Sequence, residues 1–282
     1  MILIADSGST KTEWLLLNGK QQIAEAHTQG INPYFMTEEQ IHHILVNELI
    51  PQLSAAKSTD IQQVFYYGAG CSSSQKCAMV VHPLSTLFSN ATIMVEHDLL
   101  AAARAACGTK MGMAVILGTG SNSCLFDGKH IVKNQPSLGF ILGDEGSGGH
   151  IGKELIKQFL YKELPAELQY KFEQTFHFDK DEILNTIYKK PMPNRYAASF
   201  VPFVANHIAH VHMQQLVSDC FSEFFKRHIL SYSQFTQTPL SAVGSIAFIF
   251  KQQLIKTAAK FNVSIATIIQ KPMEGLIAYH TQ

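Results

Sequence analysis

Asp6-Ser7-Gly8-Ser9-Thr10-Lys11-Thr12 separates two apolar segments, residues 2–5 and 14–17. The second segment ends at Asn18-Gly19, a pair that favours tight hairpin turns because both residues tolerate positive φ. We therefore predict a strand, a polar turn, a second strand and a second turn. A polar turn with a glycine, hydroxyls and a lysine presents backbone N–H groups and side-chain donors to an anion. The stretch is typical of a phosphate-binding hairpin.

Asp6 ends the first predicted strand, where its carboxylate can orient a hydrated Mg²⁺ ion. The alternative is an ordinary surface hairpin with a Ser/Thr turn, since short motifs often match by chance. A P-loop is excluded, because the chain has no G-x-x-x-x-G-K-[ST] sequence and the turn leads into a strand instead of a helix.

The same pattern returns at residues 113–129. Apolar residues 113–117 precede Gly118-Thr119-Gly120-Ser121-Asn122-Ser123, and a short apolar segment then leads to Asp127-Gly128-Lys129. Gly8 and Gly120 occupy equivalent places in the two copies. A repeat near half the chain length predicts two lobes with similar cores and not a solenoid, whose periods are far shorter.

Size and composition exclude several classes of protein. A chain of 282 residues is expected to form one large domain or two modest ones. Its 22 basic and 22 acidic residues balance, and no basic tract stands out, so a nucleic-acid partner has little support. Five cysteines without a C-x-x-C pair argue against a disulfide framework or zinc ribbon. Reduced thiols, no signal peptide and no membrane-length apolar run lead us to expect a cytoplasmic protein that does not bind membranes.

Strands and helices alternate along the rest of the chain. Helices predicted over residues 37–53, 73–87 and 99–106 alternate with strands over 64–67 and 92–96. This alternation indicates an α/β layer architecture. Asp98 follows the second of these strands and has two interpretations. It can be the N-cap of the next helix, a general base at the carboxyl end of a strand, where α/β folds bind ligands, or both.

Two further segments carry candidate binding residues. Asp144 and Glu145 lie in the glycine-rich stretch 143–149, before a helix predicted over 150–159, and carboxylates accept hydrogen bonds from sugar hydroxyls. The alternatives there are a flexible loop with an acidic helix start, or a calcium site that lacks the usual ligand spacing. The Asn32 side chain offers a donor and an acceptor that can bind a sugar hydroxyl or amide. The alternative is that Asn32 only forms an ordinary Asn-Pro turn.

Two other features are weaker indications of a binding site. Gly244-Ser245 joins a strand over 239–243 to a helix over 246–261, and such a turn either receives an adenosine or is a plain connection. His207, His210 and His212 allow a metal site to be considered, although no carboxylate or cysteine stands at ligand spacing.

Seven motifs, in order along nearly the whole chain, resemble one family. They are Asp6–Thr12, Gly30-Ile31-Asn32, Gly68-Ala69-Gly70-Cys71, His97-Asp98, Gly118-Thr119-Gly120-Ser121-Asn122, Gly143-Asp144-Glu145-Gly146-Ser147 and Val243-Gly244-Ser245. The sequence resembles the N-acetylglucosamine kinase branch of the BadF/BadG/BcrA/BcrD ATPase family, within the actin-like ATPase and sugar kinase superfamily. In that superfamily two hairpins hold a polyphosphate from both sides.

The resemblance implies a two-lobed α/β actin-like ATPase fold, also called ribonuclease H-like, with a duplicated βββαβα core. The N-terminal lobe is expected over residues 1–108, with a C-terminal helix at about 271–282 packing back on it, and the C-terminal lobe over 109–270. The implied reaction is ATP-dependent phosphorylation of an amino sugar, most simply N-acetylglucosamine at its 6-hydroxyl, with ATP and Mg²⁺ as cofactors. A homodimer is a further expectation from the family.

The resemblance and the two hairpins together assign roles to individual residues. By this resemblance, Asp98 is expected to be the catalytic base and Asp6 to organise Mg²⁺ through water. The predicted ATP contacts are Gly8, Ser9, Thr10, Lys11, Thr119, Gly120, Ser121, Gly244 and Ser245. The predicted sugar contacts are Asn32, Asp98, Gly139, Asp144 and Glu145.

The chain departs from the family pattern at three places. Ser7 and Ser9 replace common glycines, Ser137-Leu138-Gly139 stands where Gly-Trp-Gly is usual, and Val243 replaces a glycine of the nucleotide motif. The lost tryptophan leaves open a kinase for glucosamine or an N-acetylmuramic-type sugar. Two other classes are an iron–sulfur ATPase activator of a 2-hydroxyacyl-CoA dehydratase-type enzyme, which would need a suitable cysteine pair, and a non-catalytic sugar sensor, against which Asp98 argues.

Overall fold

The computed structural model describes residues 1–8, 11–54, 56–177 and 179–282. The chain divides into two compact units: unit 1 comprises Met1–Thr109 and Pro272–Gln282, and unit 2 comprises Lys110–Lys271. Ser9 and Thr10 of the first predicted turn lie outside the described residues. Within the described ranges, no helix is both long enough and apolar enough to span a membrane.

Unit 1 contains a five-stranded sheet in the order β3-β2-β1-β4-β5. The strands are β1 (Ile2–Ser7), β2 (Lys11–Asn18), β3 (Gln21–Gln29), β4 (Gln63–Gly68) and β5 (Thr92–His97). β1, β2 and β3 pair antiparallel, and β1, β4 and β5 pair parallel. The parallel strands require helical crossovers, which the intervening helices supply.

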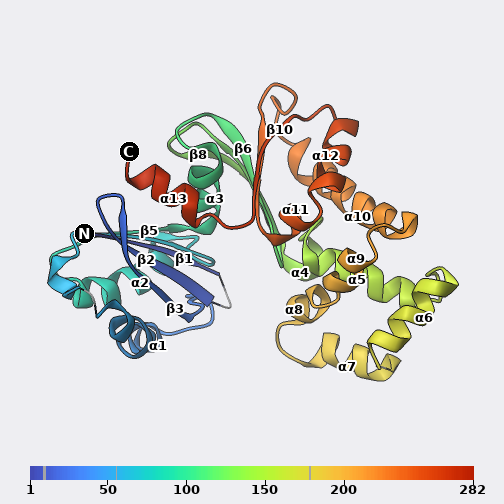
Figure 1. Ribbon diagram of the computed structural model, residues 1–282, viewed down its shortest axis with the longest axis horizontal. Helices are drawn as coiled ribbons and strands as arrows, with labels where there is room; N and C mark the ends of the chain where they lie inside the picture. The colour runs from blue at the N-terminus through green and yellow to red at the C-terminus, as the bar shows by residue number, and fades with distance from the viewer. Residues whose placement is uncertain (9–10, 55, 178) are drawn as a thin grey trace. The chain divides into compact units, whose positions relative to one another are not determined.

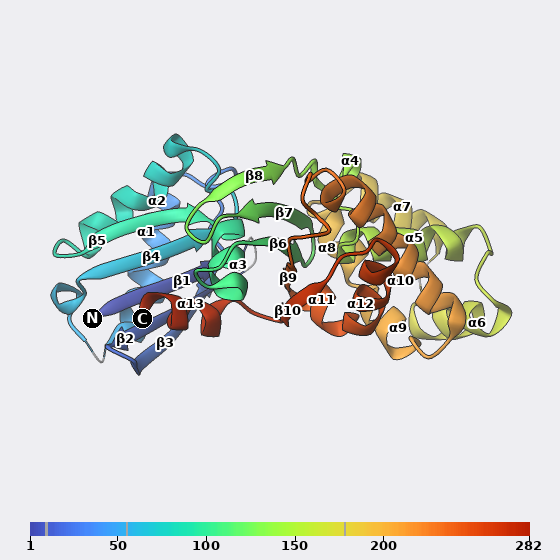
Figure 2. The same ribbon diagram turned by 90° about the horizontal axis from the view of Figure 1, so that it is seen from above.

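Helices cover both faces of this sheet. They are α1 (Glu38–Ile44), α2 (Ser74–Leu87), α3 (Asp98–Cys107) and α13 (Met273–His280), and α1 continues through a π-helical and a 3-10 turn to Leu53. α1 and α2 pack on one face, and α3 and α13 on the other (Figure 1, Figure 2). Thr37 and Gln40 form a capping box that starts α1.

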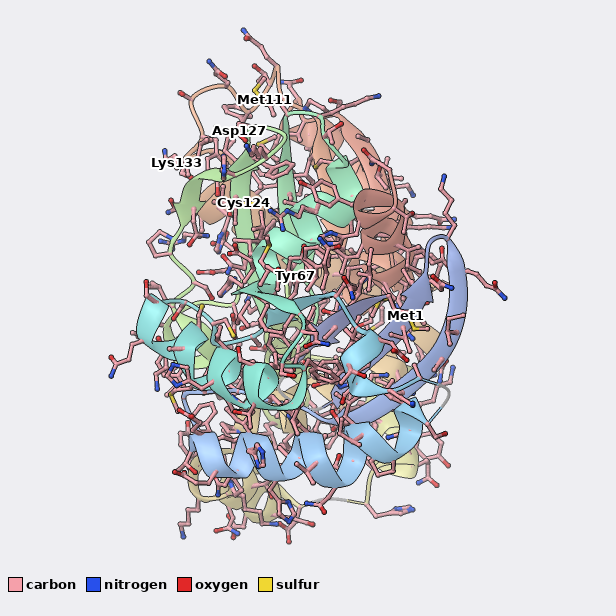
Figure 3. All side chains as sticks on the ribbon, turned by 90° about the vertical axis from the view of Figure 1, so that its left-hand side faces the viewer. Met1, Tyr67, Met111, Cys124, Asp127 and Lys133 are labelled. Atoms are coloured by element: carbon pink, nitrogen blue, oxygen red, sulfur yellow. The ribbon has the colours of Figure 1, made fainter. Side chains whose placement is uncertain are left out.

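The C-terminal helix α13 is attached to unit 1 by a polar cluster. Tyr67, labelled in Figure 3, accepts a hydrogen bond from buried Arg104 of α3 at 2.8 Å and contacts His280 Nε2 at 2.7 Å. Gly275 lies against the backbone of Ala105, so α3 and α13 approach closely. Helix α13 therefore buttresses α3, whose first residue is Asp98.

Unit 2 repeats the strand arrangement of unit 1. Its sheet has the order β10-β9-β6-β7-β8, with three antiparallel strands followed by two parallel ones. The strands are β6 (Gly112–Leu117), β7 (Ser121–Phe126), β8 (Ile131–Gln135), β9 (Leu240–Val243) and β10 (Ile265–Ile269). The predicted α/β fold with a duplicated core is therefore confirmed.

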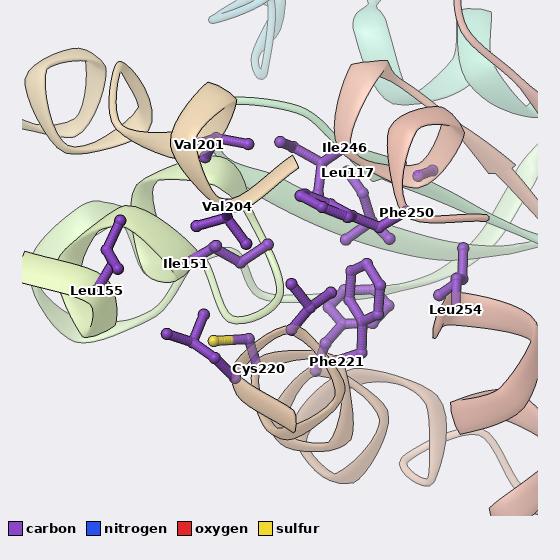
Figure 4. Packing of buried hydrophobic residues seen from close by; sticks show 14 of the residues in the cluster. Leu117, Ile151, Leu155, Val201, Val204, Cys220, Phe221, Ile246, Phe250 and Leu254 are labelled. Carbon is purple, nitrogen blue, oxygen red and sulfur yellow. The ribbon is translucent and has the colours of Figure 1, made fainter. Parts of the chain in front are cut away.

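The helices of unit 2 fill the connections between these strands. They are α4 (Gly139–Leu142), α5 (Gly148–Leu160), α6 (Ala166–Thr175), α7 (Lys180–Lys189), α8 (Pro193–Ala198), α9 (Val201–Asn206), α10 (Val211–Phe224), α11 (Ser245–Ile249) and α12 (Lys251–Lys260). Figure 4 shows Ile151 of α5, Val204 of α9 and Phe221 of α10 packing with Leu117 of β6. This core fixes the start of α5 and the end of β6 relative to each other.

Several predicted boundaries are wrong by a few residues. Asn18 pairs with Gln21, so the hairpin loop is Gly19-Lys20, with Gly19 at φ +60°. The helix predicted over 246–261 is two helices, α11 and α12, which are separated at Phe250. The sequence predicts a last strand over residues 262–269, but the strand begins at Ile265 because Asn262, at φ +58°, interrupts the extended backbone.

Gly152 makes a close helix crossing in unit 2. A Cβ atom at Gly152 would fall inside the van der Waals radius of the Ala197 carbonyl in α8. Gly152→Ala is therefore expected to destabilise unit 2 by about 1–3 kcal/mol through overpacking. Differential scanning calorimetry should show a lower melting temperature. Gln252→Ala, on an exposed position of α12, serves as the control and should leave the melting temperature unchanged.

Candidate active site

In unit 1 the candidate residues gather at the carboxyl ends of the parallel strands. Ser7 of β1 is in register with Gly68 of β4, which is in register with His97 of β5. Asp6 precedes Ser7 and Asp98 follows His97, so both carboxylates belong to the same edge of this sheet. Parallel α/β sheets bind ligands at this edge.

Buried hydroxyl groups hold the first hairpin to the segment that carries Asn32. Ser7 Oγ and Thr12 Oγ1 lie 2.7 Å apart, and the Ile31 amide donates to Ser7 Oγ at 3.2 Å. The Gly8 amide donates to the Lys11 carbonyl at 3.0 Å. Serine at position 7, where the family often has glycine, therefore has a structural function.

Asn32 is fixed from two sides. Its Oδ1 accepts a hydrogen bond from the Tyr34 amide at 3.0 Å. Gly70, at φ +84°, lies so close that a Cβ atom there would overlap Asn32 Oδ1. The Gly68–Cys71 loop therefore sets the position of the Asn32 side chain, and only glycine fits at position 70.

His97, and not Asp98, is the N-cap of α3. The Leu99 amide donates to His97 Nδ1 at 3.1 Å, and Asp98 is the first helical residue. The N-cap interpretation of Asp98 is therefore wrong, because the preceding imidazole competes successfully for the free amide. The Asp98 side chain is about 29% exposed, and its Oδ1 lies 2.8 Å from His97 Nδ1.

The charge state of His97 is linked to Asp98. Burial disfavours the imidazolium, but the hydrogen bond and negative charge of Asp98 outweigh burial and raise the pKa of His97 above its usual value. His97 Nδ1 accepts from the Leu99 amide when it is neutral and donates to Asp98 when it is protonated. His97 can therefore orient the Asp98 carboxylate when the imidazole is protonated, and in that state it no longer accepts from the Leu99 amide.

In unit 2 the second glycine turn is joined to the start of α5. The amides of Gly148 and Gly149 donate to the carbonyls of Gly118 and Thr119 at 2.8 and 3.0 Å. The first two amides of α5 are therefore used within unit 2, and it is the helix dipole, not these amides, that favours an anion near the turn.

The acidic loop and the glycine turn also meet. The Ser121 amide donates to Asp144 Oδ1 at 3.1 Å, and a Cβ atom at Gly120 would lie 3.0 Å from the same oxygen. Burial raises the pKa of Asp144, the hydrogen bond from Ser121 opposes this shift, and the charge of Glu145 adds to it. Asp144 has φ +57°, a conformation that aspartate tolerates better than most residues. Gly139, at φ +72°, begins the short helix α4 five residues before Asp144.

Beside the glycine turn lies a largely apolar pocket of about 390 Å³ within unit 2. Its lining residues come from the turn, the start of α5, α8, α9 and α11: Gly118, Thr119, Gly148, Ala198, Val201, Pro202, Ala205, Asn206, Ser245, Ile246 and Ile249. Sequence reasoning found the turn and Ser245 but missed the residues of α8 and α9. Gly244, at φ +125°, lies against the Leu117 carbonyl, where a side chain would not fit.

One polar atom at the turn has unused hydrogen-bonding capacity. Ser121 Oγ is buried and has no hydrogen-bond partner among the described residues. A buried hydroxyl without a partner is costly, and phosphate oxygens are suitable acceptors for it. The turn is therefore compatible with a nucleotide.

The three histidines of the predicted metal alternative have separate partners. His207 Nδ1 contacts the Phe203 carbonyl at 2.8 Å, His210 caps α10 and pairs with Glu167 at 3.2 Å, and His212 contacts Gln158 at 2.8 Å. The described residues contain no group of three or more His, Cys, Asp or Glu side chains that could hold a metal ion.

Comparison with solved structures identifies relatives. A protein from Porphyromonas gingivalis assigned as an N-acetylglucosamine kinase is 40% identical, covers 100% of this chain and 99% of its own, and has a TM-score of 0.95. One from Chromobacterium violaceum with the same assignment is 15% identical, with 100% and 98% coverage and a TM-score of 0.77. The ROK hexokinase from Thermus thermophilus is 12% identical, with 99% and 97% coverage and a TM-score of 0.53. Family profiles and curated proteins gave no match by sequence.

The duplicated five-stranded sheet is the α/β fold expected of actin-like ATPases and sugar kinases, and the ROK hexokinase shares this fold. The 40% identity to the Porphyromonas gingivalis protein, over the full length of this chain, identifies the family. The chain belongs to the N-acetylglucosamine kinase-like family, as its motifs predicted.

Proposed function

We propose that this protein is an ATP-dependent kinase that phosphorylates an amino sugar, with N-acetylglucosamine as the substrate and its 6-hydroxyl as the acceptor. The observation that carries the proposal is the Gly118–Ser121 turn, which is joined to the start of α5 and bordered by an apolar pocket. This combination suits a nucleotide, because phosphates prefer backbone amides and a helix N-terminus while adenine prefers apolar walls.

The nucleotide is assigned to both glycine turns. Thr119, Gly120 and Ser121 contact its phosphates, and the adenosine occupies the pocket that Ser245 borders next to Gly244. Gly8 and Lys11 of unit 1, with Ser9 and Thr10, provide further phosphate contacts in this proposal. Asp6, at the carboxyl end of β1, is the carboxylate assigned to Mg²⁺, which typically uses one or two carboxylates together with phosphates and water. Bound Mg²⁺ would neutralise phosphate charge.

The sugar is assigned to Asn32, Gly139, Asp144 and Glu145, which offer a side-chain amide, backbone groups and carboxylates to its hydroxyls. Asp98 accepts the proton of the attacking hydroxyl as its oxygen bonds to the γ-phosphorus and the bond to ADP breaks. Phosphoryl transfer depends mainly on positioning and charge neutralisation, so a correctly placed carboxylate is sufficient as the base.

A coupled ADP-release assay with Mg-ATP tests this function. N-acetylglucosamine, glucosamine, N-acetylmuramic acid and glucose should be compared, and N-acetylglucosamine is expected to give the highest kcat/KM. Preference for another amino sugar would refute the substrate, and sugar-independent ATP hydrolysis would refute the kinase. Iron bound to the purified protein would favour the dehydratase-activator alternative.

Filling the apolar pocket should weaken ATP binding selectively. Ala205→Trp places an indole in the pocket, and we expect the KM for ATP to rise at least about tenfold because the adenine loses its site. The KM for the sugar should stay unchanged. Val211→Trp adds the same ring at an exposed position of α10 outside the pocket lining and is the matched control. Equal ATP KM values for the two variants would contradict the assignment of the pocket.

A further inference from the structure

A continuous series of polar contacts leads from β8 to the acidic loop of unit 2. The Gln135 amide donates to Tyr232 Oη at 3.1 Å, and Tyr232 Oη lies 2.8 Å from Ser123 Oγ. Ser123 Oγ lies 3.3 Å from His228 Nδ1, and His228 Nε2 lies 3.4 Å from Glu145 Oε2. The series connects the strands β7 and β8 to the loop that contains Asp144 and Glu145.

Three members of this series of contacts are buried, and Glu145 is partly exposed. Ser123, Tyr232 and His228 are each at most 3% exposed, whereas the Glu145 side chain is 20% exposed. His228 lies in the π-helical turn Phe225–Ile229, and its ring stacks on Phe224 with 4.7 Å between centroids. π-helical turns often occur at functional sites, because the extra residue redirects a side chain.

The groups at the two ends of this series, the Gln135 amide and the Glu145 carboxylate, determine the direction of its hydrogen bonds. A backbone amide can only donate and an ionised carboxylate can only accept. Burial lowers the pKa of His228 and outweighs the hydrogen bond and charge of Glu145, so the imidazole is neutral near pH 7. Tyr232 then donates to Ser123, Ser123 donates to His228 Nδ1, and His228 Nε2–H donates to Glu145. Every donor has an acceptor in this direction.

We propose that His228 is a positioning residue for sugar binding: its Nε2–H holds one oxygen of Glu145, so that the carboxylate has one fixed orientation toward a sugar hydroxyl. The inference rests on the proposed function, because Glu145 is assigned to the sugar there. His228 itself is buried and does not touch the substrate. Fixing the carboxylate before binding reduces the entropy lost when the sugar binds.

Two variants separate positioning from packing. His228→Gln extends an amide N–H to about the place of Nε2 and keeps the donor to Glu145, whereas His228→Asn reaches only the place of Nδ1 and loses it. We expect His228→Asn to raise the KM for the sugar about 10–100-fold, as for a lost hydrogen bond to a charged group, with the KM for ATP unchanged. His228→Gln should restore most of the sugar affinity. Equal sugar KM values for both variants would overturn the proposal.

A second measurement on the wild-type protein does not depend on how the variants fold. Nitrogen-15 NMR of histidine-labelled protein should show His228 protonated at Nε2 and unprotonated at Nδ1, and the opposite tautomer would overturn the proposal. Wild-type protein that phosphorylates no sugar would refute the proposed function instead. The tautomer would still report whether His228 donates to Glu145.

Discussion

Asp98→Asn is expected to lower kcat for sugar phosphorylation by about 10²–10⁴-fold, the usual contribution of a general base. Asparagine has nearly the same shape as aspartate but cannot accept the hydroxyl proton. Asp98 follows the carboxyl end of β5 and lies 2.8 Å from His97 Nδ1, which places its carboxylate at the edge of the sheet where the ligands are proposed to bind. ATP affinity should stay unchanged, because ATP is assigned to other residues.

The matched control for this prediction is Glu96→Gln. Glu96 lies two residues before Asp98, in the strand β5 that leads to it, so the substitution removes the same charge from a neighbouring position. Turnover by ADP release, ATP affinity by titration and the melting temperature should be measured for both variants. Near-normal turnover of Asp98→Asn, or an equal loss in Glu96→Gln, would exclude Asp98 as the base.

Local patterns predicted the α/β layers and the repeated hairpin, and the family resemblance supplied the two-lobed actin-like fold. Strand alternation, the glycines of the two hairpins and the helix starts depend on residues close together in the chain. For this reason the hairpin strands on either side of Gly120, the capping box at Thr37 and the duplicated core were predictable. The predictions failed where two local signals compete. At the start of α3, both His97 and Asp98 can cap the helix, and only the structure shows that His97 does.

The candidate site was predictable only in part, because tertiary packing completes it. Val201, Ala205 and Ile249 line the pocket, but in the sequence they resemble ordinary core residues of amphipathic helices. His228 contacts Glu145 although the two residues are 83 positions apart in the sequence, and no sequence motif includes both. Glycines and carboxylates in short loops can be recognised from sequence, whereas apolar walls and buried positioning residues require coordinates.

Gly70→Ala is expected to impair sugar binding without altering ATP binding. The new methyl group would overlap Asn32 Oδ1, so the Asn32 side chain must move away from the position that Gly70 and the Tyr34 amide define. If Asn32 contacts the sugar as proposed, one or two hydrogen bonds are lost. We expect a rise of about 10–100-fold in the sugar KM, equivalent to about 1.5–3 kcal/mol.

Gly19→Ala separates this effect from backbone strain. Gly19 also has positive φ, at +60°, but a Cβ atom there would meet nothing within 4 Å. Both alanine variants should therefore lose roughly 1 kcal/mol of stability through strain at positive φ. Only Gly70→Ala should raise the sugar KM, which ADP release at saturating ATP will measure. Similar sugar KM values for the two variants would show that Asn32 does not hold the sugar, because its displacement would then have no effect on binding.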